Sequence, residues 1–349
     1  VNVVGPFASS ITYSDSAGLG FLPVTTNSTT VTGPSLSIPF SNVVLGARQN
    51  TGTNGIYVQV PNAVTTPLVV TLTSSDPTVA NSTLGTVTIP VNSYYAYFQI
   101  NALDVQPATI QITATATGYT AASTTVQVTA PKFFVSTSAS ANTTSAPQSM
   151  TVYAEDANGT SHYTNEDVTV TLASLSTSVA TTDSTTVTIL AGNYYNTLAH
   201  WIPNALLTSP AATQIQATDA RQPAAYAYGA GTANIAVNIP TLALNNFGGA
   251  IGIGQYSDNL YYVSTPDYQV NPLVVTLSHP GTARTTAPAN VTVPANNYYQ
   301  YFRLIGATIG TDTLVASVSS PMYNPATAFL TIGNGRFDTP AGWPSSSMH

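Results

Sequence analysis

The sequence lacks cysteine altogether and contains a single lysine, Lys132. Without cysteine, neither a disulfide nor thiolate chemistry is available to the chain. Charged residues make up 5% of the 349 residues, against about 25% in an ordinary soluble domain. The 6 basic residues and the net charge of −7 give little material for a phosphate-binding groove, which argues against nucleic acid as a partner.

Long apolar runs are also missing. No apolar stretch reaches the roughly 18 residues that a membrane-spanning helix needs, so no membrane span is predicted. The first residue is Val1, and no apolar leader flanked by Lys or Arg precedes it. We therefore expect a secreted chain whose leader is cleaved. Such poverty in charge is typical of proteins at the cell surface or in the extracellular space.

What the chain has instead is alternation of apolar and polar residues. Its hydrophobic content of 43% is enough to bury a core, and its 56 Thr and 33 Ser supply the polar positions. Apolar Ile110, Ile112 and Ala114 alternate with polar residues, and the same pattern holds over Ile235, Val237 and neighbouring positions. This period of two with β-branched residues predicts half-buried strands, and helical periodicity is nearly absent.

The chain repeats itself three times. Three landmarks recur in the same order at offsets of about 100 residues, a spacing typical of an immunoglobulin-like sandwich. The landmarks are Pro67–Leu72, Thr86–Pro90 and Asn92–Tyr95 in the first copy, Asp167–Leu172, Thr186–Ile189 and Asn193–Tyr195 in the second, and Pro272–Leu277, Asn290–Pro294 and Asn296–Tyr299 in the third. The predicted fold class is all-β, with three tandem immunoglobulin-like β-sandwiches and an extra N-terminal strand segment.

Two stretches carry a resemblance to a known family. One is Met150–Gly159, which reads MTVYAEDANG and precedes Glu166–Leu172, and the other is Ser74–Ala80 with Thr109–Ala114 further on. They resemble the immunoglobulin-like repeats of bacterial and archaeal surface proteins of the invasin, adhesin and surface-layer type. The resemblance covers roughly residues 35 to 335. It implies sandwich domains in a surface structural or adhesive role.

The landmarks divide the chain into five parts. Short joints that contain Pro131 and Pro240 predict a semi-rigid rod of sandwiches. The predicted parts are an N-terminal arm at 1–34, three immunoglobulin-like domains at 35–131, 132–239 and 240–335, and a C-terminal tail at 336–349.

Repeated tyrosines form the first candidate site. Alternation places Tyr95 and Tyr97 on the outer face of the first sandwich, opposite Tyr94, Ala96, Phe98 and Ile100. Tyrosine supplies a large contact area with few rotatable bonds, so exposed copies at repeated positions predict an interface; stacking on sugar rings and ordinary solvated strand positions are the alternatives. The predicted outward tyrosines are Tyr95, Tyr97, Tyr195, Tyr299 and Tyr301.

Carboxylates form a weaker candidate. Four of the 13 acidic residues are Glu155, Asp156, Glu166 and Asp167, and their oxygens would suit Ca²⁺. The spacing matches no EF-hand, and a solvated hairpin turn over Asp156–Gly159 is the favoured interpretation. No other metal or cofactor is predicted.

The sequence contains sequons for N-glycosylation, but a chain so rich in Asn, Ser and Thr contains them by chance. They permit glycosylation and do not indicate it. The Asn-x-Ser/Thr sites are Asn27, Asn81, Asn142, Asn158 and Asn290.

Catalytic motifs are missing from the sequence. The four histidines show no zinc-binding spacing, and neither a Gly-x-Ser-x-Gly elbow nor a phosphate loop with Lys occurs. Acidic residues recur at no repeated position, which argues against a glycoside hydrolase. We therefore expect no enzymatic activity.

The N-terminal arm is the candidate assembly device, because an apolar strand outside the repeat is a hazard unless it is paired. Its apolar residues include Val1, Val3, Val4 and Phe7. We expect this arm to dock on an adjacent subunit, with packing on its own chain as the alternative. The sequence thus favours a structural subunit of an extracellular filament, sheath or surface layer that binds itself. The alternative is a monomeric adhesin stalk or carbohydrate-binding surface module.

Overall fold

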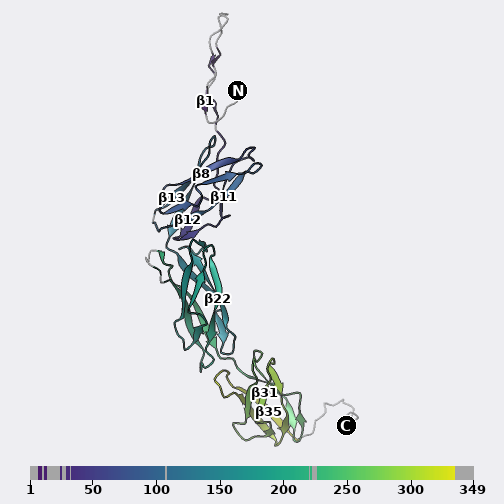
Figure 1. Ribbon diagram of the computed structural model, residues 1–349. Coiled ribbons are helices and arrows are strands. Elements are labelled where there is room, and N and C mark those ends of the chain that lie inside the picture. Colours follow the sequence, from purple (N-terminus) through teal and green to yellow (C-terminus); the bar gives the residue numbers. More distant parts are fainter. Residues whose placement is uncertain are drawn as a thin grey trace, which may run out of the picture.

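The computed structural model describes residues 33–106, 108–219, 221 and 226–334, together with four short strands within residues 7–31. Among these residues there is no α-helix, and nothing in this part of the chain is a helix that could cross a membrane. Three β-sandwiches follow one another from the N-terminal to the C-terminal side (Figure 1). The prediction of an all-β chain of tandem immunoglobulin-like sandwiches is confirmed.

Each sandwich contains a five-stranded sheet with the same strand order. In each of these sheets an early strand of the sandwich pairs in parallel with its last strand. The orders are β10 (Thr86–Ile89), β8 (Leu68–Ser74), β13 (Ile110–Thr115), β14 (Ala122–Thr129) and β5 (Asn42–Gly46) in the first; β21 (Thr186–Ile189), β19 (Val168–Ser174), β23 (Ala211–Thr218), β24 (Gly231–Asn238) and β16 (Ser140–Asn142) in the second; β31 (Asn290–Val293), β29 (Leu273–Ser278), β34 (Gly310–Ser317), β35 (Ala326–Gly333) and β26 (Ala250–Gly252) in the third.

Shorter strands form the second layer of each sandwich. In the first sandwich they are β7 (Ile56–Gln59) with β11 (Tyr95–Phe98), and β6 (Gln49–Asn50), β12 (Ile100–Ala102) and β9 (Ala80–Ser82). In the second they are β15 (Lys132–Thr137), β17 (Gln148–Glu155), β22 (Tyr195–Pro203) and β20 (Ala180–Thr182). In the third they are β25 (Ala243–Asn245), β28 (Tyr262–Ser264) and β32 (Tyr299–Tyr301), and β27 (Tyr256–Ser257), β33 (Leu304–Gly306) and β30 (Thr285–Thr286).

The alternation of the sequence becomes the two faces of each sheet. In β8, Val70 and Leu72 are buried, whereas Val69, which precedes Val70, points outward with 58% of its surface exposed. Three separate apolar clusters result, which run from Leu36 to Val128, from Phe133 to Val237 and from Leu242 to Ile332. The boundaries at residues 131 and 239 stay predictions, which the ends of these clusters support.

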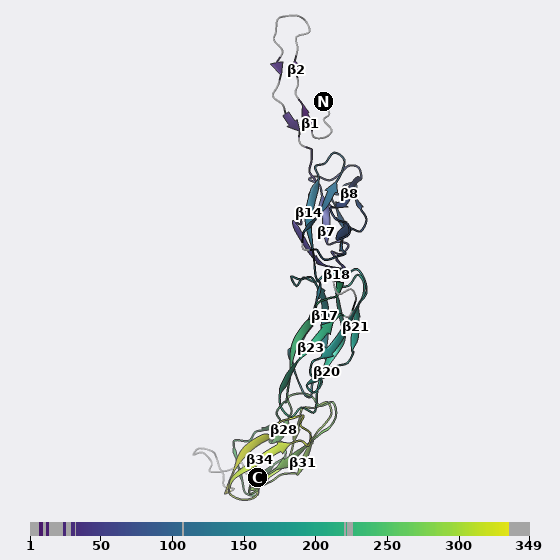
Figure 2. The same ribbon diagram turned by 90° about the vertical axis from the view of Figure 1, so that its left-hand side faces the viewer.

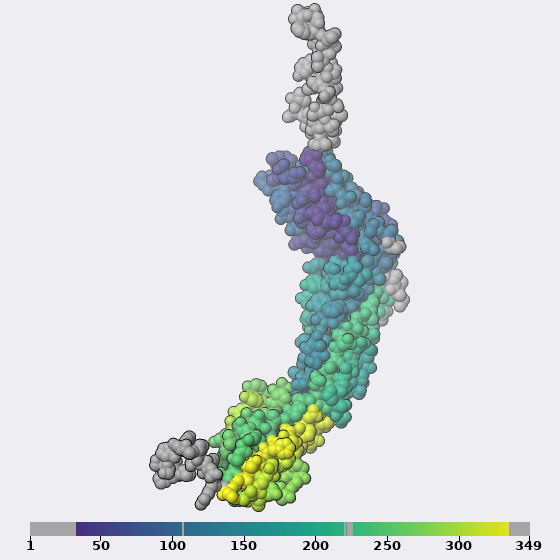
Figure 3. Space-filling view, turned by 180° about the vertical axis from the view of Figure 1, so that it is seen from behind, coloured from purple at the N-terminus to yellow at the C-terminus, as the bar shows by residue number. Residues whose placement is uncertain are grey.

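A strand crosses the joint between the first and second sandwiches. β18 (Tyr163–Thr164) belongs to the second sandwich by sequence but pairs with β6 of the first, with Tyr163 opposite Asn50. The backbone N–H of Asn165 donates to the carbonyl of Arg48 at 2.8 Å, which extends this pairing. The atoms of the two sandwiches meet directly at this joint (Figure 3). A shared sheet resists bending, as a semi-rigid rod requires.

Side chains strengthen the same joint. Gln49 is fully buried and donates from its amide to the Tyr228 hydroxyl at 3.3 Å, while its carbonyl oxygen accepts from the Gly46 N–H at 2.8 Å. The Tyr228 ring stacks on Phe133 with 4.7 Å between ring centroids. Burial raises the pKa of Tyr228 to about 12, so its hydroxyl keeps its proton far into the alkaline range.

Fewer hydrogen bonds link the second and third sandwiches than link the first and second. Thr143 donates from its hydroxyl to the carbonyl of Met322 at 2.9 Å. The side chains of Asn142 and Thr144 both reach the carboxylate of Asp267, at 3.4 and 3.5 Å. No strand pairing links these two sandwiches among the residues that the structure describes.

The four N-terminal strands pair among themselves. β1 (Phe7–Ser9) is antiparallel to β4 (Thr29–Val31), and β2 (Thr12–Tyr13) is antiparallel to β3 (Val24–Thr25), lying between them in sequence (Figure 2). The described residues show no pairing between these strands and a strand of a sandwich. The predicted assembly residues Val1, Val3 and Val4 lie outside the described residues, and Phe7 lies in β1.

Candidate functional site

A repeated turn positions the tyrosines. In the first sandwich the N–H of Ser93 donates to the carbonyl of Pro90 at 3.0 Å, and Asn92 within the turn has a φ of 63°. Asn296 and Gly192 occupy the matching positions with φ of 60° and 78°. Gly and, less readily, Asn adopt this left-handed conformation at lower cost than other residues, which explains their presence at this point of each repeat. The strand that follows each turn starts with a tyrosine.

Three tyrosines pack edge to face on the first sandwich. Tyr57 of β7 lies directly opposite Tyr97 of β11 in the antiparallel register. The ring centroids of Tyr57, Tyr95 and Tyr97 are separated by 5.7, 5.7 and 5.3 Å, and all three pairs are T-shaped. Such pairs contribute about 0.5–1.5 kcal/mol each beyond their buried area, so the rings hold one another in place.

The third sandwich repeats this triangle. Tyr262 of β28 lies opposite Tyr301 of β32, and Tyr299 completes the group. The three centroid distances are 5.7, 5.2 and 5.5 Å, again with T-shaped pairs. We call Tyr57, Tyr95 and Tyr97, and Tyr262, Tyr299 and Tyr301, the two tyrosine triads.

The second sandwich carries a variant of the triad. Tyr153 of β17 lies opposite Tyr195 of β22, 6.0 Å away between ring centroids, and Tyr194 packs on Tyr195 at 4.8 Å. The position that corresponds to Tyr97 holds Thr197 here. A register shift between Met150 and Val152 also alters the pairing of these strands. All three sandwiches therefore present a tyrosine cluster on the same layer.

The clusters are accessible to solvent. Tyr97, Tyr195 and Tyr301 are 44%, 42% and 38% exposed, whereas the phenylalanines that follow two of them in sequence, Phe98 and Phe302, are buried. Hollows of about 460 and 600 Å³ adjoin Tyr195 and Tyr301 on the second and third sandwiches. Rigid, exposed aromatic groups beside a depression are suited to binding another surface.

Sequence alternation predicted part of this arrangement. Tyr95, Tyr97, Tyr195, Tyr299 and Tyr301 all lie on the outer side of their strands, half-buried or exposed. Tyr94 differs from the prediction: it is exposed, although alternation grouped it with Phe98, and Tyr298 is exposed at the matching position of the third sandwich. The reason is that each precedes the first strand residue and so belongs to the turn.

The triad members on the neighbouring strands had no counterpart in the prediction. Tyr57, Tyr153 and Tyr262 lie outside the repeated landmarks, and they meet the outward tyrosines only through strand pairing. A search for isolated tyrosines at outward positions of the strand before each landmark could have found them.

Three of the four predicted acidic residues have hydrogen-bond or salt-bridge partners in the structure. The Asp156 carboxylate accepts from the N–H groups of Asn158 and Thr160, at 2.8 and 3.0 Å, and contacts His162 Nε2 at 3.2 Å. Glu166 pairs with Arg221 at 2.6 Å, and Asp167 accepts from the Ala191 N–H. The described part of the chain contains no group of three His, Asp or Glu side chains that could hold a metal. The structure shows the turn over Asp156–Gly159, but its first residue, Asp156, is buried and not solvated as expected; calcium binding stays a prediction.

Burial shifts the pKa values of two groups near this turn. Desolvation raises the pKa of Glu155, partly offset by Lys132, and lowers the pKa of His162 despite its contact with Asp156. His162 is therefore held in its neutral form. The packing of this turn at the joint accounts for both pKa shifts without a bound ligand.

The sequons occupy varied surroundings. Asn158 and Asn290 are exposed, whereas Asn81 and Asn142 are half-buried, and Asn27 lies outside the described residues. Asn81 accepts from the Asn101 amide at 3.5 Å, and Asn142 contacts Asp267. Glycosylation stays a prediction, and Asn158 and Asn290 are the most accessible sites for it.

Comparisons with known proteins give fold likeness alone. No protein-family model and no curated protein matches the chain. The surface-layer protein SbsC, domains 1–6, matches with a TM-score of 0.32 and 15% identity over 93% of this chain and 44% of that one. The Escherichia coli adhesin FdeC matches with a TM-score of 0.27 and 16% identity over 85% and 96% of the two chains. The I9–I11 tandem of titin has a TM-score of 0.28 and 7% identity over 85% and 98%.

The present chain therefore spans less than half of the SbsC chain that it matches, at 44%.

Proposed function

We propose that the chain is a non-catalytic structural subunit of an extracellular polymer, in which copies bind one another through the tyrosine clusters and through strand pairing by the N-terminal arm. The single observation that carries this proposal is the recurrence of an exposed tyrosine cluster on the same layer of all three sandwiches. The contacts between the rings stabilise each sandwich, and they also leave a rigid aromatic surface exposed at the same place in every repeat. Such a surface is suited to a lateral contact with a neighbouring subunit.

Low charge supports packing of identical copies. With 19 formally charged residues in 349, like-charge repulsion between touching subunits is small. The clusters contain no ionisable partner other than tyrosine, so contacts through them would depend little on salt. The same composition supports a location at the cell surface or outside the cell.

Strand donation by the N-terminal arm would have to extend a sheet that is already complete. Each five-stranded sheet already pairs its last strand with an early strand of the same sandwich, β5, β16 or β26. No sandwich therefore lacks a strand at this position. A donated arm would add to the edge of a complete sheet, as in β-augmentation, and would not fill a gap.

Electron microscopy and sedimentation of the full chain test the proposal. We expect regular filaments or sheets from the wild type at low concentration, and dispersed monomers from the double variant Tyr97→Ser with Tyr301→Ser. Phe329→Ser is the matched control, because Phe329 is an aromatic residue on the other layer of the third sandwich and, at 62%, is more exposed than either tyrosine. Unchanged polymers in the double variant would overturn the role of the clusters.

A second experiment tests the arm. Deleting residues 1–12 is expected to abolish polymerisation and to leave a folded monomer, since the sandwiches keep their own strands. Polymers that survive this deletion would contradict strand donation while leaving the tyrosine contacts in place.

The alternative function is a monomeric stalk or carbohydrate-binding surface module. The strand pairing between the first two sandwiches favours it, because a stalk needs a stiff joint. Single elongated particles at all concentrations would support the stalk and exclude the polymer.

A further inference from the structure

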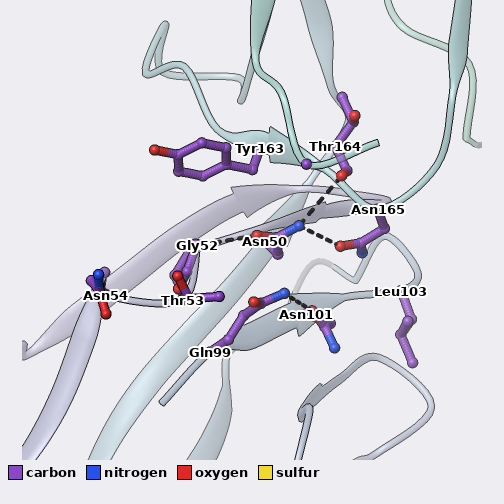
Figure 4. A pocket seen from close by; sticks show the side chains of 13 residues that line it. Asn50, Gly52, Thr53, Asn54, Gln99, Asn101, Leu103, Tyr163, Thr164 and Asn165 are labelled. Carbon is purple, nitrogen blue, oxygen red and sulfur yellow. Dashed lines mark hydrogen bonds between the residues drawn. The ribbon is translucent and has the colours of Figure 1, made fainter. Parts of the chain in front are cut away.

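A pocket opens at the joint between the first and second sandwiches. It has a volume of about 770 Å³, within the range of about 300–1,000 Å³ that small-molecule sites occupy. Its walls are the loop after β6, the strand β12 and, from the second sandwich, β18 (Figure 4). Because β18 pairs with β6, both walls belong to one sheet and their spacing is fixed.

The lining is rich in amides. Asn or Gln accounts for 5 of the 13 lining residues, against 39 of 349 in the whole chain. Thr side chains add hydroxyl groups, and no lining residue carries a charge. An amide offers both a donor and an acceptor, and a hydroxyl can act as either. The pocket thus presents both kinds of hydrogen-bonding group without a charge to select an ionic ligand.

The floor of the pocket is organised by internal hydrogen bonds. The Asn50 amide donates to Asn165 Oδ1 at 2.7 Å, and Asn50 Oδ1 accepts from the Gly52 N–H at 2.8 Å (Figure 4). Gln99 Nε2 donates to Asn101 Oδ1 at 2.8 Å, and the side-chain oxygen of Gln99, Oε1, has no hydrogen-bond partner in the described part of the chain. These bonds fix the side chains before a ligand arrives, which lowers the entropy lost on binding.

The rim adds polar groups that face solvent. Thr53 and Asn54 are exposed, and no hydrogen bond to their side chains occurs within the described residues. They lie at the tip of the loop that leads from β6 to β7. A ligand in the pocket would therefore meet unpaired donors and acceptors on this side.

Tyr163 forms one side of the pocket, and its neighbours hold its ring in one orientation. The Tyr163 ring lies against Gly52, where a Cβ would come within 2.6 Å of the ring, and it makes a T-shaped contact with Tyr194 at 5.4 Å. Gly52 has a φ of 75°, so glycine is required there both for its backbone and for the ring. Tyr163 is nevertheless 39% exposed, which leaves ring surface available.

Amides, hydroxyls and an aromatic ring without charge match one class of ligand. The hydroxyls of a pyranose need paired donors and acceptors, and its C–H face is apolar and packs on an aromatic ring. A phosphate or an acidic sugar would require cationic partners, which the lining lacks. The geometry points to a binding site for one or two units of a neutral saccharide in this pocket.

Titration calorimetry and saturation-transfer NMR on the full chain test this site, with cellotriose, maltotriose, mannotriose and tri-N-acetylchitotriose as neutral probes and trigalacturonate as the acidic one. We expect a Kd of about 1 mM or tighter for at least one neutral probe and weaker binding of trigalacturonate. Gln99→Ala and Tyr163→Ala should each weaken binding about tenfold, whereas Tyr163→Phe should preserve it.

Two controls keep the result interpretable. No hydrogen bond of the Gln99 or Asn54 side chain crosses the joint among the described residues, so Gln99→Ala and Asn54→Ala test the pocket even if Tyr163→Ala loosens the sandwiches. Tyr97→Ala, on the outer triad, should leave saccharide binding unchanged. The saccharide site is overturned if no neutral probe binds at about 10 mM, if Gln99→Ala and Tyr163→Ala bind as the wild type does, or if Tyr97→Ala abolishes binding.

The site is independent of the proposed polymer. Sedimentation of Gln99→Ala and Asn54→Ala should show the same assembly as the wild type, because neither residue belongs to a tyrosine cluster, whereas Tyr163 packs on Tyr194 of the second cluster. Failure of saccharide binding and failure of assembly are therefore separate outcomes.

Discussion

Removing the Asn165 side chain should weaken the joint between the first two sandwiches by about 3 kcal/mol. Asn165 Oδ1 accepts from the Asn50 amide at 2.7 Å, and its own amide donates to the carbonyls of Gln49 and Ala102 at 3.2 and 3.1 Å. Each net hydrogen bond contributes about 1 kcal/mol, and Asn165→Ala removes three. The second sandwich cannot unfold without breaking these bonds, so they enter its free energy of unfolding.

Urea unfolding followed by the fluorescence of Trp201 provides the assay. Trp201 is fully buried in the second sandwich, and the other tryptophan, Trp343, is replaced by Phe in all variants to leave one probe. With a denaturant slope of about 2 kcal/mol/M, a loss of about 3 kcal/mol lowers the midpoint by about 1.5 M.

Two further variants make the result specific to the joint. A double-mutant cycle with Asn50→Ala should return a coupling of about 1 kcal/mol, because the two amides contact each other. The matched control is Asn234→Ala, an exposed asparagine of β24 away from the joint, which loses one hydrogen bond from Gln214 and should lower stability by about 1 kcal/mol or less. An Asn165→Ala midpoint equal to that of Asn234→Ala would refute the reasoning.

The remaining predictions concern titratable groups. Asp312 is buried, and hydrogen bonds from Thr285 and His279 lower its pKa although burial opposes them. The ionised carboxylate therefore stabilises the third sandwich near pH 7, and this stabilisation is lost below about pH 4. Asp312→Asn should lower the urea midpoint at pH 7 and remove the loss of stability below about pH 4. Burial lowers the pKa of His162, so unfolding binds a proton and stability should fall as pH drops below about 6.5; His162→Gln should flatten this slope in thermal melts. The pKa of Tyr228 is raised from 10.0 to about 12, so stability should decline by up to about 3 kcal/mol between these values as pH rises, and Tyr228→Phe should lack that decline in alkaline urea titrations.

The sandwiches were predictable because their signals are local. Alternation over β13 and β24 and the recurrence of the Thr86–Pro90 landmark each depend on residues close in sequence. The outward position of Tyr97 followed from Phe98 pointing into the core. Successive residues of a strand point to opposite faces of the sheet, so the order of apolar and polar neighbours shows which face is buried.

The joint could not be predicted because its signals are not local. β18 is two residues long and has no periodicity of its own, yet it pairs with a strand more than a hundred residues earlier. Asn165 and Asn50 look like ordinary loop amides in sequence, and only the fold brings them within 2.7 Å. The triads could not be predicted for the same reason, because Tyr57 and Tyr262 meet the other tyrosines only through the register of strands that are distant in sequence.

The completeness of the sandwiches constrains how a polymer could form. Where a subunit lacks a strand, its fold depends on the neighbour that supplies one, and monomers are unstable. Here β5, β16 and β26 occupy that position within the same chain, so each core is closed without a partner. Dispersed monomers should therefore melt cooperatively at a temperature that hardly depends on protein concentration, whereas mass action would raise the melting temperature with concentration if assembly completed the fold. Calorimetry over a hundredfold dilution distinguishes the two, and a strong dependence would mean that the sandwiches need the neighbour after all.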